Sequence, residues 1–181
     1  MKDTFRPAAT HDAREILRAR ARALARIPAP AAAGGLLEVL EFGLAQERYA
    51  VETRHVREVQ PLKQLSPLPC TPPFLLGVVN LRGRVVPVFD IRKLFDLPEQ
   101  GLTDLHRVIV VRGADLELGL LAETIVAVRS VALDSLQASL PTLTGIRADY
   151  LKGVTAGNLV VLELDRILTD PRIVVDQRVE D

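Results

Sequence analysis

One internal repeat limits the architecture of this chain more than any other sequence feature. Its first copy is residues 74–78 (Phe-Leu-Leu-Gly-Val), a turn, and an apolar run that ends at Asp90. Its second copy is residues 150–154 (Tyr-Leu-Lys-Gly-Val), a shorter turn, and an apolar run that ends at Asp165. A hairpin of this size cannot bury a core alone. The repeat therefore predicts two similar β subdomains that share a core and leave a groove between them.

The pattern from Leu36 onward is typical of a mainly β protein. Short runs rich in β-branched residues are separated by turn residues, at a spacing that favours a sandwich or barrel over alternating β-α units. We expect strands at residues 37–44, 48–52, 74–79, 85–89, 107–111, 117–121, 125–129, 151–154 and 159–162. We expect short helical turns at residues 53–59, 91–95 and 165–168.

Residues 1–35 differ from the rest of the chain in charge and composition. Residues 1–33 carry seven basic and three acidic groups, although the whole chain has a net charge of +0. Asp12 as N-cap and Glu15 as its capping-box partner predict a basic helix, which Pro28 ends. A Pro/Ala/Gly linker follows. The helix is either a solvated element or a docking element for a partner or an anionic surface.

The composition excludes several classes of protein. A neutral chain lacks the basic surplus of a general nucleic-acid binder, so no nucleic-acid partner is expected. One cysteine, Cys70, excludes an intramolecular disulfide and a multi-cysteine metal site. No apolar run reaches the ~20 residues of a membrane span, and the N-terminus lacks the apolar region of a signal peptide. We therefore expect a cytoplasmic protein without direct membrane insertion.

The residues offer little catalytic chemistry. His11, His55 and His106 lack the spacing of metal ligands, and there is no nucleophile elbow or phosphate loop. A pair between Cys70 and His55 or His106 stays open, although the surrounding prolines favour a rigid loop residue. The matched Asp90 and Asp165 favour helix caps over paired catalytic carboxylates. No catalytic residue, metal or cofactor is predicted.

The most informative turn contains an arginine. Residues 80–83 (Asn-Leu-Arg-Gly) interrupt an apolar hairpin, and Gly83 can adopt a positive φ. Arg82 either pairs internally with a carboxylate or contacts a partner through its guanidinium; the chemistry alone does not separate the two. Val56 and Val59 would share one face of a helical turn, either buried or lining the groove near Arg82.

Residues 37–168 resemble the CheW family of chemotaxis coupling proteins, which shares its fold with the regulatory domain of the histidine kinase CheA. The resemblance rests on residues 49–51 and 56–59, residues 108–111, 119–121 and 150–154, and above all on the run from Gly77 to Asp90. That run (Gly-Val-Val-Asn-Leu-Arg-Gly-Arg-Val-Val-Pro-Val-Phe-Asp) is the most specific part. The residues of the turns and the motif are Gly77, Asn80, Leu81, Gly83, Pro87, Asp90 and Gly153.

The resemblance implies a non-catalytic adaptor made of two small five-stranded, SH3-like β-barrels in tandem. Such proteins bridge chemoreceptor tips and a CheA-type kinase at receptor arrays. By resemblance, the receptor-binding residues would be Arg82, Val56, Glu58, Val59, Val108 and Ile109. The kinase would contact the ends of both subdomains, at residues that the resemblance does not identify.

The expected organisation is a helix and linker at residues 1–35, a CheW-like domain with two intertwined subdomains at 36–169, and a tail at 170–181. Two alternative functions remain at this stage. One is a specialised paralogue that serves a different kinase or receptor system, with the N-terminal helix selecting the partner. The other is an enzyme or binder of a small molecule in the groove, which the scarcity of catalytic motifs disfavours.

Overall fold

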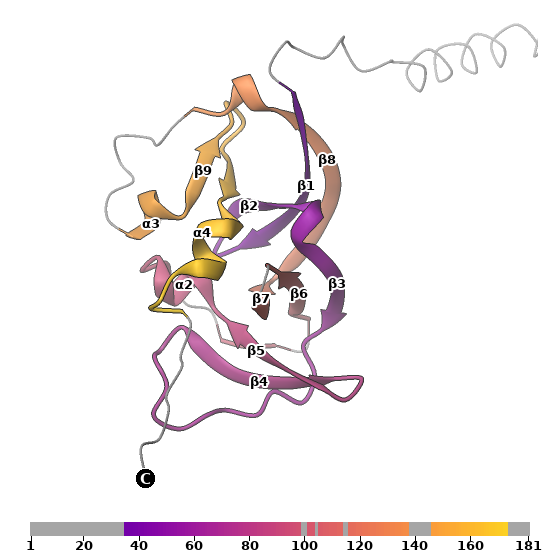
Figure 1. Ribbon diagram of the computed structural model, residues 1–181, viewed down its shortest axis with the longest axis vertical. Coiled ribbons are helices and arrows are strands. Elements are labelled where there is room, and N and C mark those ends of the chain that lie inside the picture. Colours follow the sequence, from indigo (N-terminus) through magenta and orange to yellow (C-terminus); the bar gives the residue numbers. More distant parts are fainter. Residues whose placement is uncertain (1–34, 99–100, 104, 114–115, 138–145, 174–181) are drawn as a thin grey trace, which may run out of the picture. The chain divides into compact units, whose positions relative to one another are not determined.

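A computed structural model describes residues 35–98, 101–103, 105–113, 116–137 and 146–173 (Figure 1). The predicted N-terminal helix and nearly all of its linker lie outside these residues. Within them the chain forms ten strands and a few short helices.

The ten strands form two five-stranded sheets, which confirms the predicted fold class. Sheet A has the strand order β8-β1-β2-β10-β9. Its strands are β1 (Leu36–Leu44), β2 (Glu47–Glu52), β8 (Thr124–Ala132), β9 (Leu151–Val154) and β10 (Leu159–Leu162). Sheet B has the order β3-β6-β7-β5-β4. Its strands are β3 (Val56–Pro61), β4 (Leu75–Leu81), β5 (Arg84–Phe89), β6 (Arg107–Arg112) and β7 (Glu117–Ala122).

The two sheets share one strand arrangement. Reading across either sheet, the first two neighbouring pairs are antiparallel, the third is parallel and the fourth is antiparallel. The first half of the strands does not form one sheet and the second half the other. Strands β1 and β2 pair with strands from the end of the chain, while β3–β7 form all of sheet B. Sheet B is therefore inserted in the sequence between β2 and β8 of sheet A. Strands β8, β9, β10, β1 and β2 correspond in order to β3, β4, β5, β6 and β7.

The repeated glycines mark the positions where each sheet curls toward closure. Ser66 bridges to Val78 beside Gly77, and Gln137 bridges to Val154 beside Gly153. A Cβ on Gly77 would lie 2.3 Å from the carbonyl oxygen of Ser66, and one on Gly153 would lie 3.0 Å from the Cβ of Leu136. A side chain at either position would thus displace the closing segment. This contact explains why glycine recurs in both copies of the repeat.

The apolar residues form one shared core and two smaller ones. The shared core contains Phe42 and Tyr49 from sheet A and Ile109 and Leu118 from sheet B, all fully buried. A second cluster lies within sheet A: Val39, Ala50, Val131, Leu159 and Val161. A third lies within sheet B: Val79, Val86, Val88, Val108 and Val110. The predicted sharing of a core is confirmed, since neither sheet buries both of its faces without the other.

The prediction of a helical turn over residues 53–59 is wrong for most of its length. Only Thr53–His55 form a 3-10 turn (η1), and Val56 begins β3. A β-bulge between Val56 and Glu58 adds one residue to the strand, so Val56 and Val59 both pack against the shared core despite their odd spacing. The bulge thereby imitates the i,i+3 spacing of a helix.

Two further helices follow the hairpins of the repeat. The side chain of Asp90 caps α2 (Ile91–Leu94) by accepting a hydrogen bond from the backbone N–H of Arg92. The matching prediction for Asp165 is wrong: α4 (Leu164–Thr169) begins after Glu163, and Asp165 lies inside its first turn. Asp165 instead pairs with Arg54 at 2.7 Å. The remaining short helices are η2 (Leu133–Ser135) and α3 (Ile146–Asp149).

A buried ion network joins the two sheets. Arg92 is 2% exposed and donates to both carboxylate oxygens of Asp90. Its Nη1 also lies 3.0 Å from Oε1 of Glu123, which accepts a bond from the backbone N–H of Ala45 in sheet A's β1–β2 turn. The carboxylates next to the guanidinium raise the pKa of Arg92. The network therefore ties the end of the first repeat to the other sheet.

The packed region continues into residues that the sequence analysis places in the tail. Ile173 is buried in the shared core. The Tyr150 hydroxyl donates to Asp170 and accepts from Arg172, whose guanidinium lies 5.6 Å from the centre of the Tyr150 ring. Residues 170–173 thus close over the second copy of the repeat.

Candidate partner-binding site

The turn between β4 and β5 holds its arginine in an unfavourable backbone conformation. Leu81 pairs with Arg84, so Arg82 and Gly83 form a two-residue turn. Their φ angles are +53° and +84°. Positive φ at both central positions defines a type I′ turn, which suits the right-handed twist of a hairpin and favours Asn-Gly over Arg-Gly.

The guanidinium of Arg82 is not needed to form this turn. The Asn80 Oδ1 accepts a hydrogen bond of 2.8 Å from the Gly83 backbone N–H, which closes the turn locally. The Arg82 side chain is 80% exposed, and its nearest carboxylate oxygen, Oε2 of Glu58, is 3.7 Å away. An exposed pair at that distance adds at most about 1 kcal/mol of stability. Internal bracing is therefore a weak explanation for this arginine.

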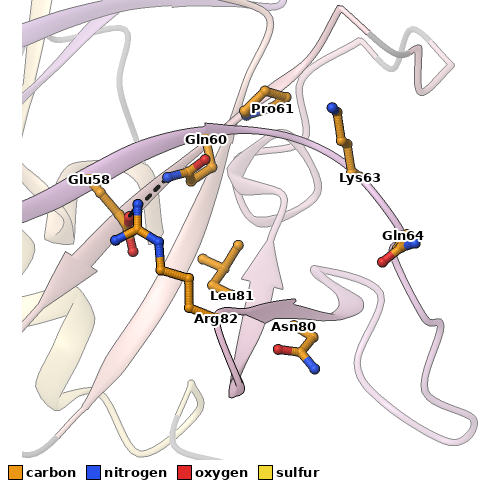
Figure 2. A pocket seen from close by; sticks show the side chains of 8 residues that line it. All are labelled: Glu58, Gln60, Pro61, Lys63, Gln64, Asn80, Leu81 and Arg82. Atoms are coloured by element: carbon orange, nitrogen blue, oxygen red, sulfur yellow. Dashed lines mark hydrogen bonds and ion pairs between the residues drawn. The ribbon is translucent and has the colours of Figure 1, made fainter.

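Glu58 is the centre of a polar network on β3 (Figure 2). Its Oε1 lies 3.1 Å from Nη2 of Arg84, and its Oε2 accepts a 2.9 Å bond from Nε2 of Gln60. Arg84 also pairs with Glu117 on β7. The Glu58 carboxylate is consequently held by β5 and by its own strand, whether or not Arg82 stays beside it.

A shallow polar depression surrounds this network. Its volume is about 480 Å³. Its lining consists of β3 and the segment after it, together with the β4–β5 turn: Glu58, Gln60, Pro61, Lys63, Gln64, Asn80, Leu81 and Arg82. Figure 2 shows Arg82 reaching across from the turn toward Glu58 and Gln60, with Lys63 and Gln64 farther along the segment. The depression offers two exposed cations, one shielded carboxylate and amide groups, a set suited to polar contacts with another protein.

The structure separates the predicted receptor-binding residues into two groups. Arg82 and Glu58 lie together at the depression, while Val56 and Val59 are half-buried on the opposite face of the strand, against the core. The expectation that Val108 and Ile109 face a groove is wrong, because they are 1% and 0% exposed. Their strand lies between two cores: Val108 packs within sheet B and Ile109 packs against sheet A.

The remaining motif residues hold the hairpin in place. Leu81 packs beside the core of sheet B, and Gly77 and Gly153 admit the closing segments. Pro87 lies just before Val88, where the parallel ladder with β7 begins, so its missing N–H interrupts no bond to that strand. Asp90 caps α2 at the other end of β5.

Sequence reasoning missed four residues of the lining and the arginine that pairs with Glu58: Gln60, Pro61, Lys63, Gln64 and Arg84. Had residues 56–61 been read as a strand, the period of two would have placed Glu58 and Gln60 on one face. Arg84 is the residue after the turn, and its side chain meets Glu58 although β6 and β7 lie between β3 and β5 in the strand order, a contact that no local sequence pattern records.

The residues that chemistry would single out as catalytic or metal-binding are not grouped together in the described part of the chain. Among them, no three His, Cys, Asp or Glu side chains are grouped as metal ligands would be. Asp90 and Asp165 are engaged by different arginines, and the Nδ1 of His106 accepts from the backbone N–H of Thr103.

No helix in the described part of the chain is long and apolar enough to cross a membrane.

Comparisons with known proteins agree with this architecture. A family model described as a CheW-like domain matches residues 38–172. A chemotaxis protein CheW of Treponema pallidum is 27% identical over 75% of this chain and 84% of its own length. The protein FrzA of Myxococcus xanthus is 30% identical over 68% of this chain and 78% of its own.

A solved structure gives the same result in three dimensions. The scaffolding protein TtCheW of Thermoanaerobacter tengcongensis superposes with a TM-score of 0.66 at 26% identity, covering 76% of this chain and 91% of that one. The region matched by the family model, residues 38–172, contains the repeat and the Arg82 turn. The chain belongs to the CheW-like family of chemotaxis coupling proteins.

Proposed function

We propose that this protein is a non-catalytic adaptor that couples the cytoplasmic tips of chemoreceptors to a CheA-type histidine kinase. The family membership and the arrangement of two equivalent sheets around one core support this function. An adaptor needs two partner surfaces on a rigid body, and the shared core provides that body. We expect it to act in the cytoplasm, at membrane-associated receptor arrays.

The observation that carries the receptor site is the exposed position of Arg82 in a left-handed backbone conformation. That conformation costs an L residue other than Gly, Asn or Asp about 1 kcal/mol or more. The turn is closed by Asn80, and the nearest carboxylate is 3.7 Å away, so the local fold gains little from the arginine. Six other described residues that are not glycine also have positive φ, but Arg82 combines this conformation with a guanidinium that is 80% exposed, which favours a binding surface.

The receptor surface in this proposal consists of Arg82 and Glu58, with Val56 and Val59 supporting β3 from the core side. An incoming helix can take the Arg82 guanidinium without disrupting Glu58, because Arg84 and Gln60 continue to hold that carboxylate. Lys63 adds a second cation to the same depression. The surface therefore accepts a polar or acidic helix tip.

The proposal is tested by calorimetric titration of a receptor-tip fragment from the same organism into the wild-type chain, Arg82→Glu and Arg166→Glu. Arg166 is an exposed arginine of α4, so its variant matches the charge change at a different place. We expect Arg82→Glu to weaken binding by at least roughly tenfold and Arg166→Glu to bind like wild type. Equal binding by all three proteins would overturn the Arg82 site.

A further inference from the structure

Sheet A carries a depression at the place that corresponds to the Arg82 site of sheet B. It has a volume of about 340 Å³ and lies between β8, its following turn and the β9–β10 turn. The matching elements in sheet B are β3, its following segment and the β4–β5 turn. Its lining is Arg48, Arg129, Ser130, Val131, Ala132, Ser135, Thr155, Ala156, Gly157 and Leu159.

The two depressions differ in the residue at one equivalent strand position. Arg129 pairs with Val39 on β1, and Gln60 pairs with Val108 at the matching position of β6, so Arg129 corresponds to Gln60. The amide that lies beside Glu58 in the first depression is thus replaced by a guanidinium in the second. Each depression thus combines two cations with one carboxylate, but the β9–β10 turn lacks an arginine and both cations of the second depression lie on strands.

The second depression contains a buried carboxylate that is paired with two arginines. Glu41 is 2% exposed, and its two carboxylate oxygens lie 3.4 Å from Nη1 of Arg48 and 2.8 Å from Nη1 of Arg129. Both guanidiniums are about half-exposed. Arg48 also donates to the carbonyl of Gly157. Two cations around one buried anion leave a net positive charge at the surface.

One of these arginines, Arg129, has donors that no described residue accepts from. Among the described residues, Arg129 donates only to Glu41, through Nη1. Its Nε and Nη2 groups therefore have no protein acceptor there. No carboxylate lines the depression, although Asp134 lies on the neighbouring η2 turn. A guanidinium anchored on one side and open on the other suits a charge-assisted bond to an incoming carboxylate.

We propose that the Arg48–Arg129 depression is a second partner-binding site, which takes an acidic segment of a protein different from the one bound at Arg82. The idea of a second partner rests on the adaptor function proposed above. The recognition itself does not, because it follows from the two arginines, their buried counter-ion and the open donors.

The test uses the isotopically labelled full chain, titrated with a hexaglutamate peptide with acetylated and amidated ends and followed by NMR. We expect saturable amide shifts at Arg48, Arg129, Ser130 and Gly157 at about 50 mM salt, where surface charges are weakly screened. Arg129→Gln should weaken binding of the peptide by roughly tenfold. This variant leaves Glu41 paired with Arg48, so it should stay folded.

Glu41→Gln should change the peptide affinity in the opposite direction, which separates a binding role of the arginines from a structural one. It removes the competing carboxylate, so the peptide should bind more tightly, whereas a purely structural ion pair predicts no gain. Inorganic phosphate and free glutamate serve as second and third ligands. Equal shifts and affinities with either one would indicate a free-anion site and overturn the peptide assignment.

Shifts confined to the basic residues of 1–33 or to the Arg82 turn, or no shifts, would also overturn the proposal. These outcomes do not depend on the adaptor function. A chain that binds the peptide at Arg129 but no receptor fragment contradicts the proposed function and leaves the second site supported.

Discussion

Nη2 of Arg82 lies 3.7 Å from Oε2 of Glu58, while Arg84 and Gln60 hold the same carboxylate at 3.1 and 2.9 Å. The most exposed of the three donors is therefore also the most distant. This order makes Arg82 the group that can move to a partner at the smallest loss, since the carboxylate keeps its other two bonds.

Replacing Arg82 by Asn should separate binding from folding. Asn-Gly is favoured in a type I′ turn, so we expect the free energy of unfolding to be unchanged or up to about 1 kcal/mol higher. Receptor binding should nevertheless weaken, because the guanidinium is lost. Urea denaturation and calorimetry on the same protein check both halves. A clear loss of stability would instead favour internal bracing.

Gly77 and Gly83 provide a matched pair for the closing contact of sheet B. Both have positive φ, but a Cβ on Gly77 would meet Ser66 at 2.3 Å and one on Gly83 would meet nothing within 4 Å. We expect Gly83→Ala to cost about 1 kcal/mol and Gly77→Ala several times as much. Equal denaturation midpoints for the two variants would contradict the account of the repeat.

The buried network around Arg92 should dominate the stability of the β5–α2 junction. Arg92→Met leaves Asp90 and Glu123 without their buried counter-charge, and we expect a loss of about 3–5 kcal/mol. Arg84→Met removes a half-exposed guanidinium and should cost no more than about 1 kcal/mol. The comparison is made by chemical denaturation; similar losses for the two variants would argue against the network.

The Tyr150 phenol should lose its proton at a higher pH than an ordinary tyrosine. Burial and the bond to Asp170 raise the pKa of Tyr150 from 10.0 to about 12. The folded state therefore holds the proton more tightly than the unfolded state. The resulting stabilisation is complete below pH 10 and is lost as the pH rises toward 12. Ultraviolet titration of Tyr49→Phe, which leaves one of the two tyrosines, measures this directly.

A variant of Asp170, which accepts the hydrogen bond of Tyr150, provides the control. Arg172 holds the pKa of Asp170 well below its usual range, so that carboxylate is ionised at neutral pH and accepts from Tyr150. Asp170→Asn should lower the pKa of Tyr150 toward its ordinary value. A phenol that titrates near pH 10 in the wild-type fold would refute the described closure by residues 170–173.

The sequence predicted the parts of the fold that local patterns control. The repeated glycines, the alternating apolar runs and the Asp90 cap all follow from contacts within a hairpin and its helix. The pairing of β1 and β2 with strands more than 70 residues later could not be predicted in this way, because no local pattern records it. Sheet A therefore joins strands from both ends of the described region, whereas sheet B is continuous in sequence from β3 to β7.

The errors at the site have physical causes. The bulge at Val56 and Glu58 gives a strand the apolar spacing of a helical turn. Val108 and Ile109 belong to a continuous apolar run, which is the pattern of a strand buried on both faces, and the structure buries both of them. Arg82 was identified because an arginine at a hairpin tip is unusual, whereas its conformation is visible only in the structure.

In the proposed function, this chain lets a receptor control a kinase. The most direct measurement is the autophosphorylation rate of the CheA-type kinase from the same organism, with receptor-tip assemblies, in the presence and absence of the chain. We predict that the receptor changes the rate only when the wild-type chain is present, and that Arg82→Glu abolishes the effect while Arg166→Glu preserves it. A rate that is the same with and without the chain would contradict the adaptor function.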